Sequence, residues 1–260
     1  MKPPPVAYAL PATLDEALDL LATSDDAAVI AGGQSLVPLL NLRLARPELL
    51  VDLAAIPGLD AVTTDGGELV VGAATTAATL LAHPACFDGL REALAEVGHP
   101  QIRSRPTVGG SIAHADPAAE LPAGLAGLGG SVELASRDEG TRAVAATDFF
   151  DGAFSTTRRP DELLVAVRFP IPTGPSTFVE VARRHGDFAL VGVFAAQTDR
   201  GLAFGISGVA GVPVRSLGGA GLDDLDPPDD IHASAEHRRA LVGTLVARAT
   251  ERVADRAVAS

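Results

Sequence analysis

The sequence predicts an α+β fold divided into two or three subdomains. Residues 13–53 follow the order helix, strand, glycine turn, short helix and strand, which is typical of a small α/β unit. Further along, residues 131–135 and 141–145 flank Asp138-Glu139-Gly140 in the pattern of an antiparallel hairpin. With 260 residues the chain is long enough to bury a substantial core.

The first helix is predicted by its cap and by its apolar spacing. Thr13 stands before the helix and Glu16 follows three residues later, as in a capping box. Leu14, Leu18 and Leu21 then recur at helical spacing. We therefore expect a helix from residue 14 that packs through its leucines.

A glycine pair ends the next strand. The apolar run 28–31 stops at Gly32-Gly33, Gln34-Ser35 follows, and residues 36–40 begin a short helix. Such an order leaves several backbone N–H groups unpaired and pointing the same way, an arrangement that binds anions. Because the chain has five Gly-Gly pairs, an ordinary turn is the alternative interpretation.

A second glycine stretch favours the anion interpretation. Thr107-Val108-Gly109-Gly110-Ser111 again sets a glycine pair and a small polar residue between apolar neighbours. Two such stretches would hold the two halves of one pyrophosphate. Downstream, Asp116-Pro117 is expected to be the N-cap and the first residue of another helix.

The remaining elements are predicted from apolar runs and helix stop signals. Strands are expected at 69–73, 163–169, 178–183, 189–196 and 202–209, helices at 76–81 and 90–97, and a long amphipathic helix at 231–258.

Charge and motifs exclude several functional classes. A net charge of −13 argues against nucleic-acid binding. Lys2 is the one lysine, so the chain has neither a P-loop lysine nor a Schiff-base lysine. The patterns GxGxxG, GxSxG and HExxH are absent from the sequence. Backbone amides and arginines would therefore have to hold an anionic ligand.

Cysteine content and hydropathy suggest the compartment. The single cysteine, Cys86, excludes an internal disulfide and an iron–sulfur cluster held by this chain alone. No apolar run approaches about 18 residues, so membrane insertion is not expected. Residues 1–5 lack the apolar core of a signal peptide. We expect a cytoplasmic protein.

Five longer segments stand out around these motifs. They are AGGQSLVPLLNLRLARP (31–47), HPQIRSRPTVGGSIAHADPAAELP (99–122), DFFDGAFSTTRRPDELL (148–164), VARRHGDFALVGV (181–193) and DDIHASAEHRR (229–239). Together they resemble one known family, the FAD-binding medium subunits of the molybdenum hydroxylases, the group of carbon monoxide dehydrogenase and xanthine dehydrogenase. The matching segments occur in family order from roughly residue 3 to residue 258.

The resemblance implies a fold of the vanillyl-alcohol-oxidase (PCMH) type. Two FAD subdomains, residues 1–57 and 58–172, would enclose the cofactor. A C-terminal domain, residues 173–260, would contain a three-stranded sheet with helices.

The resemblance also implies the site residues. The two glycine stretches would wrap the pyrophosphate, Glu120 would lie beside ribityl or ribose hydroxyls, and Asp187 and Phe188 would close on the flavin. The expected FAD-binding residues are Ala31, Gly32, Gly33, Gln34, Ser35, Leu36, Thr107, Gly109, Gly110, Ser111, Asp116, Glu120, Arg184, Asp187 and Phe188. No catalytic acid or nucleophile and no metal ligand is expected, because the flavin carries the redox chemistry.

By the same resemblance the chain would transfer electrons from iron–sulfur clusters of a partner, through FAD, to an external acceptor. The expected partners are a large molybdopterin subunit and a small 2Fe-2S subunit, in a dimer of heterotrimers.

Three departures from the family pattern keep two alternatives open. Pro106 stands where the family usually has glycine, and Ala77 stands where it often has histidine. The segment 215–229 is about 20 to 30 residues shorter than the family pattern. The first alternative is a stand-alone FAD-dependent oxidoreductase without partner subunits. The second is a non-catalytic relative in which Pro106 prevents flavin binding.

Overall fold

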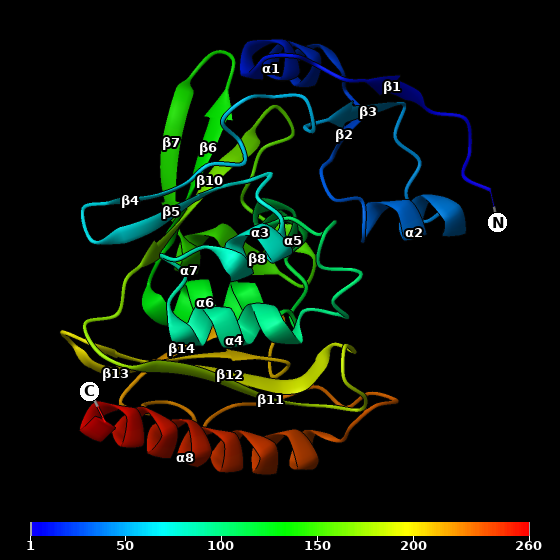
Figure 1. Cartoon of the computed structure of the whole chain (residues 1–260). Coiled ribbons are helices and arrows are strands. Elements are labelled where there is room, and N and C mark those ends of the chain that lie inside the picture. The colour runs from blue at the N-terminus through cyan, green and yellow to red at the C-terminus, as the bar shows by residue number, and fades with distance from the viewer. Residues whose placement is uncertain (1, 260) are drawn as a thin grey trace.

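The computed structural model describes residues 2–259, so Met1 and Ser260, the end residues of the expected subdomains, lie outside it. Three larger β-sheets and the helices between them are stacked in layers, from the N-terminal sheet at the top of Figure 1 to the C-terminal sheet and helix at the bottom. The mixed helix and sheet architecture confirms the α+β class.

The N-terminal sheet is parallel, with the order β1-β3-β2. Its strands are β1 (Ala7–Ala9), β2 (Ala27–Ile30) and β3 (Leu49–Asp52), and its helices are α1 (Leu14–Thr23) and α2 (Leu36–Leu42). The capping box is confirmed, because Thr13 Oγ1 accepts the amide of Glu16 and the Glu16 carboxylate accepts that of Ala12. Leu18 and Leu21 pack α1 into a core with Val51.

The central sheet is antiparallel, with the order β4-β5-β10-β6-β7. The hairpin predicted around Asp138 is confirmed as β6 and β7, which pair from Ser131–Ala145 to Ser136–Gly140. The strands are β4 (Val62–Asp65), β5 (Glu68–Gly72), β6 (Ser131–Ser136), β7 (Gly140–Ala145) and β10 (Leu163–Pro170); α7 (Ala146–Phe149) and the small pair β8 (Phe150–Gly152) and β9 (Ser155–Thr156) follow β7.

Four short helices fill the space below this sheet: α3 (Ala77–Ala82), α4 (Asp88–Glu96), α5 (Val108–His114) and α6 (Glu120–Leu128). Every residue of α6 is buried, because α6 lies between the central sheet and the C-terminal sheet (Figure 1). Leu121 and Leu125 of α6 share one core with Phe169 of β10 and Phe194 of β12.

The C-terminal sheet has four strands, where the sequence led us to expect three. They are β11 (Ser176–Ala182), β12 (Ala189–Thr198), β13 (Gly201–Ser207) and β14 (Val214–Leu217). The fourth is a short edge strand defined by its pairing with β13, a contact that its own residues do not reveal. One face of the sheet packs on α8 (Ala235–Ala259), and the other packs on α4 and α6.

Two predicted helix starts are wrong. Helix α6 begins at Glu120 because Asp116 forms a turn, in which its Oδ1 accepts the amide of Ala118. Helix α8 begins at Ala235, where Ser234 Oγ accepts the amide of His237, while Ile231 is exposed before it. Between residues 2 and 259 no helix is both long and apolar enough to cross a membrane.

Candidate functional site

The first glycine stretch, residues 31–36, joins β2 to α2. Gly33 has φ +73°, which favours glycine, and its carbonyl oxygen accepts the amide of Val37 at 3.0 Å. Within residues 2–259, no group accepts a hydrogen bond from the amides of residues 32–36. The stretch therefore presents a row of free N–H donors at a helix start, which is the geometry the sequence predicts.

The second stretch, residues 107–111, begins α5 and is not an open turn. Thr107 caps the helix, because its Oγ1 accepts the amide of Gly110 at 3.0 Å. The amide of Gly109 donates to the carbonyl oxygen of Ala73, and those of Val108 and Ser111 are also bonded within the protein. The expectation that both stretches offer free amides is therefore wrong for the second, whose donors are used by the helix and by the segment after β5.

The first stretch touches the loop that leads directly into the second. Gly32 packs against the backbone of Arg105 and Pro106, so closely that a Cβ at position 32 would lie 2.0 Å from the Arg105 carbonyl oxygen. The carbonyl oxygen of Pro106 accepts the amide of Ala77 at 2.9 Å. Pro106 does not have a positive φ, so proline fits this loop and the approach of the two stretches is built around it.

Thr75 adds an unused polar group next to the second stretch. Its carbonyl oxygen accepts the amide of Val108 at 2.9 Å, while its fully buried hydroxyl has no partner in the described chain. Buried hydroxyls are normally hydrogen-bonded to protein, water or ligand. Nothing in the sequence distinguishes Thr75 from the adjacent Thr76, so a role for Thr75 in the site was not predicted.

Glu120 is a buried carboxyl at the start of α6. The residue is 4% exposed, and its carboxyl accepts a hydrogen bond from its own backbone amide, which lowers its pKa. Burial raises the pKa of Glu120 to about 7, and the charges of Asp116 and Glu96 add to the effect. The positive charge of Arg103, whose guanidinium donates to the Val97 and Gly98 carbonyl oxygens after α4, acts in the opposite direction.

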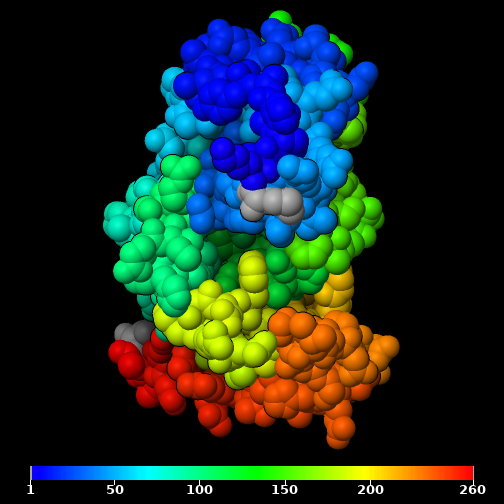
Figure 2. All heavy atoms as spheres, turned by 90° about the vertical axis from the view of Figure 1, so that its right-hand side faces the viewer, coloured from blue at the N-terminus to red at the C-terminus, as the bar shows by residue number. Residues whose placement is uncertain are grey.

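Arg184, Asp187 and Phe188 lie on the turn that joins β11 to β12, and all three are exposed. The turn rests on the end of α4: His185 Nδ1 is 3.4 Å from a Glu96 carboxylate oxygen, and Gly186 adjoins the ring of His99. Figure 2 shows a hollow between the blue N-terminal elements and this yellow-green turn, with green atoms at its floor. The predicted residues thus come from three layers of the fold.

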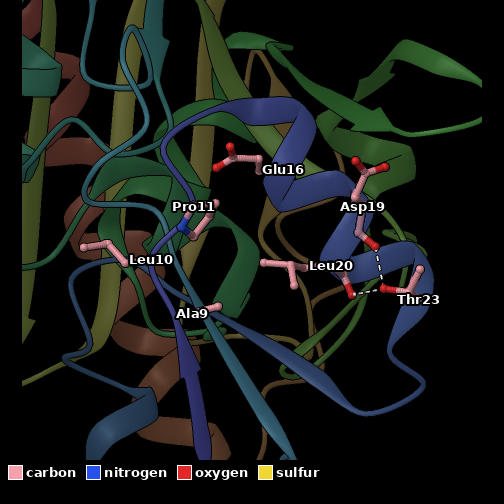
Figure 3. A pocket seen from close by; sticks show the side chains of 7 residues that line it. All are labelled: Ala9, Leu10, Pro11, Glu16, Asp19, Leu20 and Thr23. Carbon is pink, nitrogen blue, oxygen red and sulfur yellow. Dashed lines mark hydrogen bonds between the residues drawn. The ribbon is translucent and has the colours of Figure 1, made fainter.

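A separate depression lies between β1 and α1 (Figure 3). It has a volume of about 390 Å³ and is lined by Ala9, Leu10, Pro11, Glu16, Asp19, Leu20 and Thr23. It contains no predicted site residue, and the carboxylates of Glu16 and Asp19 would repel a phosphate. We do not assign the anion site to it.

Known proteins match this arrangement over almost its whole length. The family model of the FAD-binding domain in molybdopterin dehydrogenase matches residues 4–172. The chain belongs to this family. Membership makes FAD its cofactor and oxidoreduction its chemistry, so the interpretation in which Pro106 prevents flavin binding is not supported.

Two sequence relatives and one solved structure show how closely the FAD-binding family is matched. The nicotine 6-hydroxylase medium subunit of Paenarthrobacter nicotinovorans is 36% identical, over 95% of this chain and 97% of its own length. The carbon monoxide dehydrogenase medium chain of Afipia carboxidovorans is 35% identical, over 96% and 97%. A chain of quinoline 2-oxidoreductase from Pseudomonas putida 86 superposes with a TM-score of 0.91 at 36% identity, covering 98% of this chain and 99% of that one.

Proposed function

We propose that this chain is the FAD-carrying medium subunit of a molybdenum-containing dehydrogenase and passes electrons from iron–sulfur clusters of a partner subunit to an external acceptor. Relatives named as medium subunits or medium chains match it from end to end, which supports a subunit and not a stand-alone oxidoreductase. Bound FAD would supply the electron-transfer chemistry, while the protein binds and orients it.

The observation that carries the proposal is the row of free amides at residues 32–36. Backbone N–H donors at a helix start favour a negatively charged group, and the lone lysine, Lys2, lies outside every predicted site segment. Because Gly32 adjoins Arg105 and Pro106, a diphosphate on these amides would lie next to the second stretch. There the unpartnered Thr75 hydroxyl is a further donor.

The remaining assignments are proposals of the same kind. Glu120 and Asp116 are proposed to face the hydroxyl-bearing part of FAD, and Arg184, Asp187 and Phe188 to cover the flavin from the C-terminal side. The proposed contacts along the two stretches are Ala31, Gly32, Gly33, Gln34, Ser35, Leu36, Thr107, Gly109, Gly110 and Ser111. For Thr107, Gly109, Gly110 and Ser111 the free amides first expected are not present. The contacts proposed there instead are a close approach of helix α5 to the cofactor and hydrogen bonds from the Thr107 and Ser111 hydroxyls.

The layout is proposed to be of the PCMH type, with FAD subdomains 1–57 and 58–172 and a C-terminal domain 173–260. The three larger sheets support this division: the first holds β1–β3, the second holds β4–β7 and β10, and the third holds β11–β14. The partners are proposed to be a large molybdopterin subunit and a small 2Fe-2S subunit, in a dimer of heterotrimers. Support comes from Cys86, which is the single cysteine and is buried, so this chain cannot hold a cluster by itself.

The test is purification from the native host without a tag on the partners. We expect a yellow protein that releases FAD on denaturation and co-elutes with a molybdenum-containing chain and an iron–sulfur chain. A colourless protein that excess FAD does not convert would contradict the cofactor assignment. A yellow protein that elutes alone and turns over a substrate would instead favour the stand-alone oxidoreductase.

A further inference from the structure

The turn that carries Asp187 and Phe188 rests directly on the residues that follow α4. Gly186, within this turn, has φ +86°. A Cβ at this position would lie 2.8 Å from Cε1 of the His99 ring and 3.2 Å from the carbonyl carbon of Gly98. The backbone of the turn therefore lies against residues 98 and 99, an approach that requires glycine.

A pair of histidine rings forms a second contact next to the first. The ring centroids of His99 and His185 are 5.8 Å apart. On the same imidazole, His185 Nδ1 lies 3.4 Å from a carboxylate oxygen of Glu96, near the end of α4. Two consecutive residues of the turn, 185 and 186, are thus in contact with the end of α4, and His99 takes part at both.

Phe188 depends on such contacts for its position. It is 57% exposed, so burial of its own ring does not fix where it lies. The start of the turn is held as well, because Arg183 Nη1 donates to His232 Nδ1 at 3.0 Å. The turn is therefore supported along residues 183–186, and the aromatic side chain follows immediately after the supported part.

The next turn of the same sheet has no comparable support. Gly201, between β12 and β13, also has a positive φ, +99°, but nothing lies within 4 Å of a Cβ placed there. Reversal of the chain between two antiparallel strands therefore does not require contacts of this kind. The contacts of Gly186 and His185 serve to place the turn.

His99 also begins the loop that leads to the first glycine stretch. Its carbonyl oxygen accepts the amide of Arg103 at 3.2 Å, and Arg103 is only 8% exposed. The loop, residues 99–106, ends where Gly32 packs against the backbone of Arg105. One loop therefore touches the turn with Phe188 at one end and the stretch with the free amides at the other.

We propose that His99 is a positioning residue for the cofactor site: it holds the turn at residues 185–186, and the turn places Phe188 over the flavin and slows the release of FAD. The proposal rests on the proposed function, which assigns FAD to this chain and Phe188 to the cover of the flavin. His99 acts through Phe188 and does not touch the cofactor. Glu96 supports the same arrangement through His185.

The first experiment measures the turn itself, without cofactor. Trypsin cleaves after arginine, and Arg183 and Arg184 lie exposed on the turn. In the FAD-free full-length protein, His99→Ala and Gly186→Ala should each raise the rate of cleavage at these two sites by about threefold to tenfold, because proteolysis follows the population in which the turn has left its contacts. Cleavage after Arg200, exposed on the turn between β12 and β13, is the internal reference for His99→Ala and Gly186→Ala and should keep its rate.

Two further variants are matched controls. Gly201→Ala places alanine at a similarly positive φ but in open space, so it introduces the backbone strain without a clash. His237→Ala removes an exposed histidine from α8. Both should leave cleavage after residues 183 and 184 at the wild-type rate.

The second experiment asks whether His99 acts through Phe188. After reconstitution with FAD, the rate of cofactor dissociation is followed by the fluorescence of released flavin. His99→Ala and Phe188→Ala should each accelerate dissociation by about threefold to tenfold, and the double variant should be no faster than Phe188→Ala alone. A general loss of stability in His99→Ala would instead add to the effect of Phe188→Ala.

Wild-type cleavage rates at the turn in both His99→Ala and Gly186→Ala would overturn the proposal while leaving FAD binding intact. Additive effects of His99→Ala and Phe188→Ala on FAD dissociation would overturn it too. A wild-type protein that binds no FAD would contradict the proposed function, and with it the role of Phe188, whatever the cleavage rates are.

Discussion

A Cβ atom at position 32 would lie 2.0 Å from the carbonyl oxygen of Arg105, so Gly32 is the point at which the two glycine stretches meet. The second stretch follows that carbonyl within two residues. The first stretch supplies the free amides. The two stretches can therefore form one binding site only if residue 32 has no side chain.

Gly32→Ala should therefore damage both stability and FAD binding. Backbone, and not a flexible side chain, occupies the position of the new methyl group, so the loop at 105–106 must move. We expect a loss of about 2 to 4 kcal/mol in unfolding free energy and at least a tenfold weaker FAD affinity. Denaturant unfolding and flavin fluorescence titration measure the two. Gly243→Ala, at an open position on α8, should be neutral or stabilising by up to about 1 kcal/mol. If Gly32→Ala and Gly243→Ala had the same unfolding free energy and the same FAD affinity, this explanation would be wrong.

Gly33→Val and Gly110→Val should remove flavin colour for two different reasons. At Gly33 valine must adopt φ +73°, whereas at Gly110 its Cβ would lie 2.8 Å from Thr107 Oγ1 and disturb the cap of α5. Absorbance of the purified variants measures bound flavin, and circular dichroism shows whether they fold. A folded variant of Gly33 that stays yellow would count against the donor row.

Pro106→Gly should leave FAD binding intact and lower stability. Pro106 has no positive φ, so glycine gains nothing in the folded state and adds freedom to the unfolded chain. The expected loss is about 0.4 to 1 kcal/mol, measured by denaturant unfolding. If FAD affinity instead rose tenfold, proline would be hindering the cofactor after all.

Stability of the FAD-free protein should fall as pH rises from about 5 to about 8.5. The folded pKa values of Glu120, about 7, and Glu180, about 8, lie above the ordinary value of a glutamate. The folded state therefore binds more protons than the unfolded state in this window, and its stability decreases as pH rises. Glu120→Gln should make the dependence weaker, with the part due to Glu180 remaining. Thermal unfolding of the wild type and of Glu120→Gln across this pH range provides the measurement. If stability depended on pH equally in the two proteins, Glu120 would not be a source of the dependence.

Glu92 should make the protein less stable in acid. Partial burial raises the pKa of its carboxyl, but its bonds to Thr177, Arg256 and Phe178 outweigh burial and hold the pKa below the usual value of a glutamate. The stabilisation from these bonds is therefore present above the usual pKa and is lost as pH falls through the lowered pKa. Arg256→Met should cost about 1 to 3 kcal/mol at neutral pH, since it leaves the carboxylate with fewer donors. Arg248→Met, at an exposed position on the same helix, is the control and should change unfolding free energy by less than about 0.5 kcal/mol.

Local signals were predicted well from the sequence. The cap at Thr13 and the hairpin around Asp138 depend on residues close in the chain, and the structure has both. The positive φ of Gly33 follows from the same local logic, because a strand must turn at once into a helix. Family resemblance then supplied FAD, which local chemistry alone does not specify, while the position of Glu120 beside the cofactor stays a prediction.

Long-range pairing was not predictable in the same way. Strand β14 is a strand only because β13 lies beside it. The alignment of Glu180, Gly192 and Ser207 across β11, β12 and β13 depends on the register of three strands, and a shift by one residue would reverse the face of every side chain. The amides of Val108 and Gly109 were wrongly expected to be free, because their acceptors, at Thr75 and Ala73, lie more than thirty residues earlier. The amides of Gly110 and Ser111 are bonded locally to Thr107, the helix cap.

The bond between Arg256 and Glu92 also bears on synthesis of the protein. It joins the last turns of α8 to the helix that runs beside β11, and Arg256 additionally donates to the carbonyl oxygen of Ser176. A nascent chain on the ribosome lacks this tie until α8 has emerged, so the packing of α4 against the C-terminal sheet is completed last. A truncation within α8 is therefore expected to loosen this packing.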